Sequence, residues 1–127
     1  MRITVNGHKY SGVIIDILKI AFNHLPFDIP DDIREDIKLA TNEALVNAIK
    51  YGGDNVYIDI EINAKHFLAM IRDSGEGFNW RRYTIMPDPE AECGRGIPLM
   101  LKLMDKVEYN NTGNCVLLVR NLTRGEQ

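Results

Sequence analysis

The sequence predicts an α+β fold, a two-layer α/β sandwich in which helices cover one face of a mostly antiparallel sheet. Short segments of alternating or continuous apolar residues predict strands, and longer segments with helical spacing predict helices. Turn residues separate the two kinds of segment. The expected order is β, α, α, β, β, α, β, β, without a repeat or linker, so residues 1–127 are expected to form one domain.

The N-terminal segment is expected to contain a strand followed by a helix. Residues 2–5 alternate between polar and apolar, and Asn6-Gly7 predicts a two-residue hairpin turn before residues 8–10. Apolar residues at helical spacing then predict a helix over about residues 11–24. Prolines at positions 26 and 30 indicate the loop that follows, since the residue before a proline is disfavoured in a helix.

A second helix has clear start and stop signals. Asp32 and Glu35 have the spacing of a capping box, and Gly52-Gly53 is a typical stop. Between these signals a single apolar stripe is expected to face the core. It consists of Ile33, Ile37, Ala40, Ala44 and Ala48.

The second half of the chain is expected to supply four strands and one short helix. The strands are expected at residues 56–62, 67–71, 106–109 and 115–120. Residues 79–93 contain prolines and acidic residues and are expected to be a mobile loop. Gly94-Arg95-Gly96 is expected to open the short helix, because Pro98 suits a first helical turn.

Composition and charge exclude several classes of protein. A net charge of −3 argues against a general nucleic-acid binder, which would carry a basic excess. No apolar run approaches the roughly 20 residues that cross a bilayer, and the N-terminus does not resemble a signal peptide. Cys93 and Cys115 lack metal-ligand spacing and are expected to be reduced thiols. We therefore expect a cytoplasmic protein that contacts neither membrane nor nucleic acid directly.

Two polar residues of the second helix are candidates for phosphate chemistry. Glu43 and Asn47 are four residues apart, so they share one face at the edge of the apolar stripe. A carboxamide oxygen suits Mg²⁺, which keeps several waters and takes few protein ligands. A carboxylate one turn away can accept a proton from an attacking hydroxyl. Alone, this spacing is more typical of two solvated helix residues.

Two glycine-containing motifs follow in the second half of the chain. Asp73 at a strand end can accept a hydrogen bond from an exocyclic amine such as that of adenine, and Gly75 and Gly77 permit close backbone approach. Gly94-Arg95-Gly96 at a helix start offers free N–H groups and a cation to phosphate. Alone, the first is also an ordinary turn and the second an ordinary helix start. No Walker or dinucleotide fingerprint is present.

Together these motifs resemble those of the Bergerat-fold ATPases, the superfamily of gyrase B, MutL and the histidine kinases. The N box corresponds to residues 43–52, the G1 box to residues 73–78 and the G2 box to residues 94–100. Within that superfamily the chain is most similar to bacterial anti-sigma factors that are serine kinases. Histidine kinases usually carry a second asparagine where this chain has Glu43, and Phe78 also matches the anti-sigma group.

The resemblance implies ATP and Mg²⁺ as ligands and a role for each motif residue. Asn47 would bind the metal, Glu43 would be the general base and Asp73 would accept from adenine. The remaining nucleotide-binding residues implied are Tyr51, Gly75, Gly77, Phe78, Gly94, Arg95, Gly96 and Ile97. The implied partners are a sigma factor and a STAS-type anti-anti-sigma protein, and the implied assembly is a homodimer formed through the N-terminal segment.

Two alternatives stay open. The chain could be a non-catalytic regulatory module in which nucleotide sets the shape of a partner-binding surface. It could also be a stand-alone histidine-kinase catalytic domain. Cys93 and Pro98 depart from the residues usual in the anti-sigma group, which bears on the loop over residues 79–93.

Overall fold

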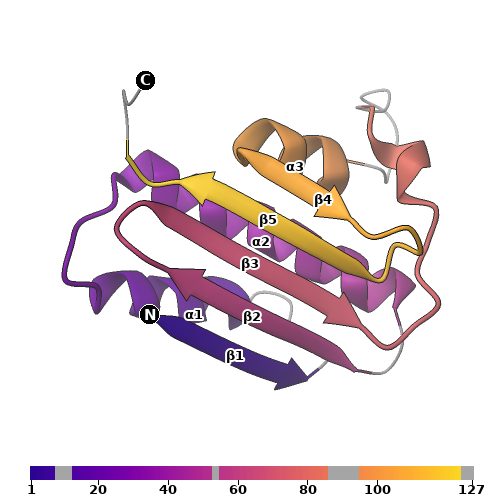
Figure 1. Ribbon diagram of the computed structural model, residues 1–127, viewed down its shortest axis with the longest axis horizontal. Helices are drawn as coiled ribbons and strands as arrows, with labels where there is room; N and C mark the ends of the chain where they lie inside the picture. The colour runs from indigo at the N-terminus through magenta and orange to yellow at the C-terminus, as the bar shows by residue number, and fades with distance from the viewer. Residues whose placement is uncertain (8–12, 53–54, 86–94, 124–127) are drawn as a thin grey trace.

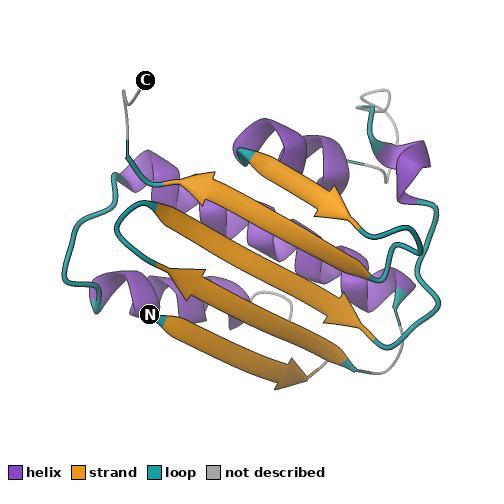
Figure 2. Ribbon diagram, viewed as in Figure 1, coloured by secondary structure: helices purple, strands orange, loops and turns teal. Residues whose placement is uncertain are grey.

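A five-stranded antiparallel sheet forms one layer of the molecule in the computed structural model, which describes residues 1–7, 13–52, 55–85 and 95–123 (Figures 1 and 2). The strand order is β1-β2-β3-β5-β4, and each neighbouring pair is antiparallel. The strands are β1 (Arg2–Gly7), β2 (Val56–Ile62), β3 (His66–Asp73), β4 (Lys106–Tyr109) and β5 (Cys115–Asn121).

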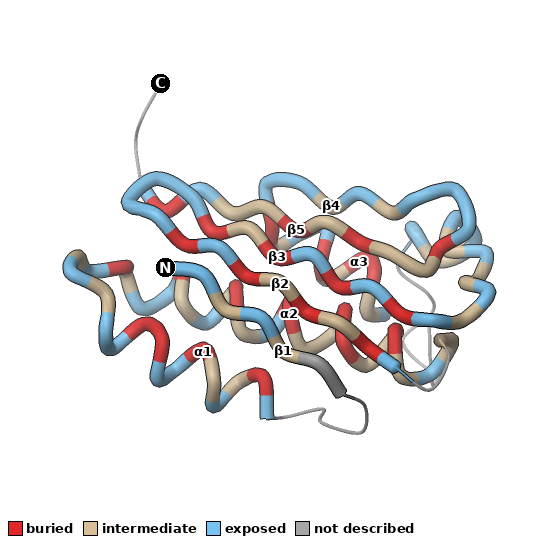
Figure 3. Tube along the Cα trace, turned by 60° about the horizontal axis from the view of Figure 1, so that its bottom comes forward, coloured by how far each residue is buried: buried red, intermediate tan, exposed pale blue. Residues whose placement is uncertain are grey.

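Three helices lie on one face of this sheet (Figures 1 and 3). They are α1 (Val13–Asn23), α2 (Asp31–Tyr51) and α3 (Gly96–Leu103). The whole apolar stripe expected on α2 is buried, and the alternate residues of β2 and β3 that face it are buried too. This layering confirms the predicted α+β sandwich. Within the described residues no helix is long and apolar enough to cross a membrane.

The first predicted hairpin is wrong. Asn6 and Gly7 belong to β1, where they pair with Tyr57 and Val56 of β2. A hairpin turn would reverse the chain at these two residues, whereas pairing with a strand distant in sequence keeps the backbone extended through both. Residues 8–12 lie outside the described part of the chain, so the expected second arm of the hairpin is not described.

The predicted capping box of the second helix is also wrong. The helix begins at Asp31, and Pro30 is its N-cap, without a side-chain capping hydrogen bond. Proline suits this position because its φ is already restricted, and its carbonyl accepts the N–H of Arg34 at 3.0 Å. Asp31 and Asp32 instead occupy the first turn, where negative charge complements the helix dipole.

Part of the segment expected to be irregular forms a short 3₁₀-helix, η1 (Trp80–Tyr83). Its first residue, Trp80, packs against the end of β4. The Trp80 indole stacks on Tyr109 with centroids 5.6 Å apart, and Nε1 donates to the Asn110 carbonyl at 3.0 Å. These tertiary contacts, which no local pattern indicates, order the segment. Residues 86–94 lie outside the description, so the expected loop there is not tested.

Candidate functional site

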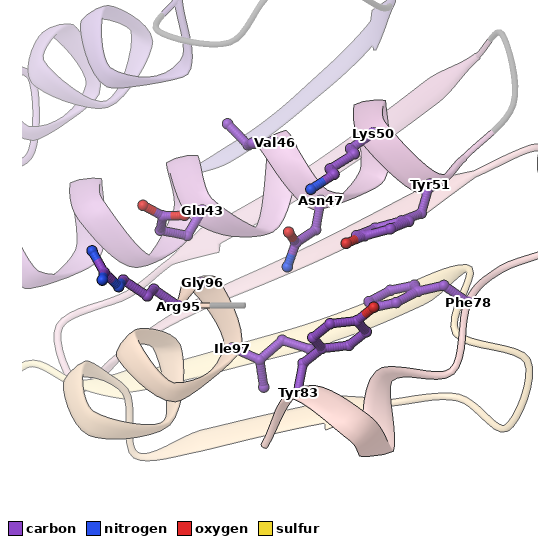
Figure 4. A pocket seen from close by; sticks show the side chains of 10 residues that line it. All are labelled: Glu43, Val46, Asn47, Lys50, Tyr51, Phe78, Tyr83, Arg95, Gly96 and Ile97. Carbon is purple, nitrogen blue, oxygen red and sulfur yellow. The ribbon is translucent and has the colours of Figure 1, made fainter. Parts of the chain in front are cut away.

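A pocket of about 280 Å³ opens between the C-terminal half of α2 and the start of α3 (Figure 4). Helix α2 lines one side of the pocket, and α3, η1 and the segment after β3 line the other. The lining residues are Glu43, Val46, Asn47, Lys50, Tyr51, Phe78, Tyr83, Arg95, Gly96 and Ile97.

Glu43 and Asn47 lie next to the first residue of α3. A Cβ atom added to Gly96 would be 3.1 Å from Glu43 Oε2 and 3.3 Å from Asn47 Nδ2. The absence of a side chain at Gly96 therefore lets the backbone of α3 approach both polar groups. Both side chains are only partly buried, so they remain reachable from solvent.

The start of α3 is suited to negative charge. Helix α3 has eight residues, and Arg95 is its N-cap without a side-chain capping hydrogen bond. Its first backbone N–H groups lack partners within the helix, which is the usual basis of phosphate binding at helix N-termini. Lys50 and Arg95 bring two positive charges to the same pocket, against the one negative charge of Glu43.

Aromatic rings close the opposite end of the pocket (Figure 4). Tyr51 at the end of α2 stacks on Phe78, with centroids 4.4 Å apart and ring planes 9° apart. Tyr83 of η1 is tilted against both rings, at 6.2 Å from Tyr51 and 6.1 Å from Phe78. Such offset and tilted arrangements are favourable for aromatic pairs.

Asp73 does not line the main pocket. It is 7% exposed, and its Oδ1 accepts the backbone N–H of Gly75 at 2.7 Å. It lines a second cavity of about 10 Å³ together with Phe78 and Tyr109. Phe78 lines both cavities, so it forms part of the wall of the pocket that contains Glu43 and Asn47 and of the cavity beside Asp73.

Gly75 and Gly77 bring the loop after β3 into contact with the turn before β5. The Gly75 carbonyl accepts the Asn114 side-chain N–H at 3.2 Å. Gly77 has a φ of 84°, and a Cβ atom there would be 1.9 Å from the Thr112 carbonyl oxygen. Only glycine fits such a position, where φ is positive and another backbone is in contact.

Tyr109 at the end of β4 carries a buried hydroxyl beside this site. Burial raises its pKa to about 12, while the neighbouring Asn47 side chain acts to lower it. The described residues nevertheless offer this hydroxyl no hydrogen bond, so Asn47 is near but not bonded to it. The Phe78 ring meets the Tyr109 ring edge-on at 5.5 Å.

Most of the predicted site residues gather in one place. The main pocket contains Glu43, Asn47, Tyr51, Phe78, Arg95, Gly96 and Ile97. Asp73 lines the second cavity, Gly75 and Gly77 lie in the loop after β3, and Gly94 lies outside the described residues. The roles assigned to these residues stay predictions.

Sequence reasoning missed three lining residues, Val46, Lys50 and Tyr83. Helical spacing could have found two of them, since Val46 follows Glu43 by three positions and Lys50 follows Asn47 by three. Tyr83 had no signal, because it lies in a segment expected to lack structure. The sequence likewise predicts Tyr109 only as part of a strand.

Comparison with known families agrees with this fold and site. A family model of the histidine kinase-like ATPase domain matches residues 16–120. The chain therefore belongs to the histidine kinase-like ATPase domain family, whose fold binds and uses ATP. No curated protein matches the chain.

Proposed function

We propose that this protein is an ATP- and Mg²⁺-dependent serine/threonine-protein kinase of the anti-sigma type. In this proposal it binds a sigma factor and phosphorylates a STAS-type anti-anti-sigma protein in the cytoplasm. The observation that carries the kinase proposal is the position of Glu43. Its carboxylate lies beside Asn47 and the start of α3, where the terminal phosphates of bound ATP would be held.

The arrangement supports a definite orientation for ATP. The phosphates suit the end with Gly96 and Arg95, where backbone N–H groups and a cation are available. The base suits the end with Phe78 and Asp73, where aromatic surface adjoins a buried carboxylate.

The donor set fits a magnesium ion that arrives with the nucleotide. Asn47 would supply one carboxamide oxygen, and phosphate oxygens and waters would supply the others. The described residues contain no group of three or more His, Cys, Asp or Glu side chains that could hold a metal. When bound, Mg²⁺ neutralises charge on the phosphates and holds them in one orientation.

Glu43 would act on the acceptor hydroxyl. As the serine oxygen bonds to the γ-phosphorus, its proton passes to the Glu43 carboxylate. The bond between the γ-phosphorus and the bridging oxygen breaks, and ADP leaves with the electron pair. Histidine needs no such base, which supports a hydroxyl acceptor. The identity of the protein partners rests on the sequence resemblance to anti-sigma factors.

Glu43→Gln tests the proposal directly. This variant keeps the shape of the side chain but cannot accept the proton, so phosphotransfer to an anti-anti-sigma protein from the same host should fall about 10²- to 10⁴-fold. Its Kd for Mg²⁺-ATP by calorimetry should stay within about twofold. Glu61→Gln, on the exposed face of β2, is a matched control and should transfer normally.

Three results would contradict the proposal or favour one of its alternatives. Undiminished transfer by Glu43→Gln would remove the base role from that residue. ATP binding without transfer to any tested partner would favour the non-catalytic module. An acid-labile product would identify a phosphohistidine and therefore a stand-alone histidine-kinase catalytic domain.

We also propose a homodimer formed through the N-terminal segment. Strand β1 is an edge strand and pairs only with β2 within the described residues. Beside it lies an apolar hollow of about 350 Å³ lined by Met1, Ile3, Ile17, Ile20, Ala21 and His24. The Ile20 side chain is 62% exposed, and a second copy of the chain would cover it.

Ile20→Lys should convert a dimer to a monomer in light scattering, and a monomeric wild type would refute the proposal.

A further inference from the structure

The Tyr109 hydroxyl is a buried polar group that no described residue satisfies. Its oxygen is inaccessible to solvent and has no hydrogen-bond partner in the described part of the chain. Buried polar groups in proteins are nearly always hydrogen-bonded, because leaving one unpaired is costly. A partner from outside the described chain is therefore expected at this position.

The surroundings of this hydroxyl identify the kind of partner. Tyr109 and Asp73 line the same cavity of about 10 Å³, and the charge of Asp73 acts on the phenol. The Asn47 side chain, which lines the main pocket, is also near the hydroxyl. Tyr109 thus neighbours both the buried carboxylate and a residue of the pocket, and it packs against the Phe78 ring, which lines both cavities.

A purine base can reach this position only when Phe78 moves. The Tyr51 and Phe78 rings are 4.4 Å apart, whereas a third ring between them would need about 7 Å. The cavity beside Asp73 has room for about one water molecule and none for a base. Rotation of the Phe78 side chain would join the two cavities and bring a bound base against Asp73 and Tyr109.

We propose that Tyr109 is a specificity-determining residue, whose hydroxyl donates a hydrogen bond to a ring nitrogen of adenine while Asp73 accepts from the exocyclic amine. This inference rests on the proposed ATP-binding function. Adenine presents a donor amine beside an acceptor nitrogen on both of its edges, at N1 and at N7. A carboxylate and a hydroxyl side by side match that pair, and a base with another pattern would leave one of them unpaired.

Tyr109→Phe removes the hydroxyl and retains the ring that packs on Phe78 and Trp80. Its Kd for ATP by calorimetry should rise about three- to tenfold, as expected for one neutral hydrogen bond. The same comparison with 1-deaza-ATP and 7-deaza-ATP locates the acceptor. With the analogue that lacks the accepting nitrogen, wild type and variant should bind equally, while the other analogue keeps the full difference.

A stability measurement separates this role from a structural one. Because the hydroxyl has no hydrogen-bond partner among the described residues, Tyr109→Phe should not lower the melting temperature without nucleotide, yet should reduce the increase produced by ATP. Thr41→Val is a matched control. Thr41 Oγ1 is the other buried side-chain atom without a partner among the described residues, and Thr41 lines neither cavity. The affinity of Thr41→Val for ATP should equal that of wild type.

Two results would overturn the inference while leaving the proposed function intact. One is wild-type affinity for ATP in Tyr109→Phe. The other is an equal loss of affinity for ATP and both analogues, because that would indicate a hydroxyl that positions Asn47 rather than one that contacts the base. Failure of the wild-type protein to bind ATP would refute the proposed function itself.

Discussion

At the scale of single residues, Asp73 combines burial with a fixed orientation. One carboxylate oxygen accepts the Gly75 N–H, and the Asp73 backbone N–H donates to the Asn114 carbonyl at 2.9 Å. These bonds keep the side chain at the end of β3, facing the cavity it shares with Tyr109. A group held in this way needs no reorganisation when a ligand binds.

Asp73→Asn should weaken the binding of adenine nucleotides. The change replaces a charged acceptor with a neutral amide, so the Kd for ATP should rise about 10- to 100-fold by calorimetry. Asp59→Asn is a suitable control, because Asp59 accepts from Thr4 at 2.8 Å on β2, away from the site. An unchanged affinity in Asp73→Asn would exclude adenine recognition by this carboxylate.

Tyr109 should make the stability of the protein depend on pH in alkaline solution. Its pKa is about 12 in the folded state against 10.0 for the free side chain, with burial as the main cause. The raised pKa favours the protonated folded form, so this stabilisation is complete below pH 10 and is lost as the pH rises through 12. The difference between these pKa values corresponds to a total loss of about 3 kcal/mol.

The measurement compares wild type with Tyr109→Phe by denaturant unfolding between pH 9 and pH 12, a range set by these pKa values. Other tyrosines and lysines titrate in both proteins, so only the difference between the two curves reports on Tyr109. If the two plots of unfolding free energy against pH were parallel, the Tyr109 pKa would be the same in the folded and unfolded states.

At the scale of elements, the end of α2 fits closely against the end of β3. Gly52 terminates the helix through its N–H, which donates to the Ala48 carbonyl at 2.8 Å. A Cβ atom on Gly52 would lie 2.3 Å from that oxygen and 2.4 Å from Asp73 Cγ. The stop signal of the helix is therefore also required for the packing of α2 against Asp73.

Gly52→Ala should lower the free energy of unfolding by about 1–3 kcal/mol, because the methyl group displaces either the helix end or Asp73. It should also weaken ATP binding. Gly96→Ala offers the contrast, since its methyl group would meet only the ends of the Glu43 and Asn47 side chains. Denaturant titration should show little change in the free energy of unfolding of Gly96→Ala. An equal loss of that free energy in Gly52→Ala and Gly96→Ala would contradict this account.

The candidate site could be predicted from sequence to the extent that it is local. Glu43 and Asn47 share a helix face, so their proximity follows from helical spacing alone, and the Val46 and Lys50 positions follow by the same rule. Tyr83 and Tyr109 could not be found this way. They reach the site only because η1 packs on the end of β4, a contact between segments separated in sequence.

At the scale of the whole molecule, Arg120 of β5 joins the helical layer to the sheet. Its guanidinium lies 3.2 Å from Asp36 of α2 and 3.9 Å from Asp105, and it also donates to the Leu103 carbonyl at the end of α3. The side chain is 21% exposed, so water screens these contacts only in part. Charged hydrogen bonds of this kind contribute more than exposed ion pairs.

Arg120→Gln should therefore reduce the free energy of unfolding by about 1–2 kcal/mol. Lys106→Gln is the matched control, because the Lys106–Glu108 pair at 3.2 Å is more than half exposed on both sides. That change should cost about 0.5 kcal/mol or less in the same urea titration. A loss of equal size in the two variants would show that Arg120 does not hold the layers together.

The sequence by itself determined the α+β class, the α2 stripe and most of the residues that line the pocket. These features repeat at the period of a helix or strand, or lie within one short motif, so neighbouring residues are enough to specify them. Tertiary structure alone decided that β1 continues through Asn6 and Gly7, that η1 forms, and that Tyr109 and Phe78 line one cavity with Asp73. Those outcomes depend on pairing and packing between distant segments, whose energy exceeds the local preferences of turns and caps.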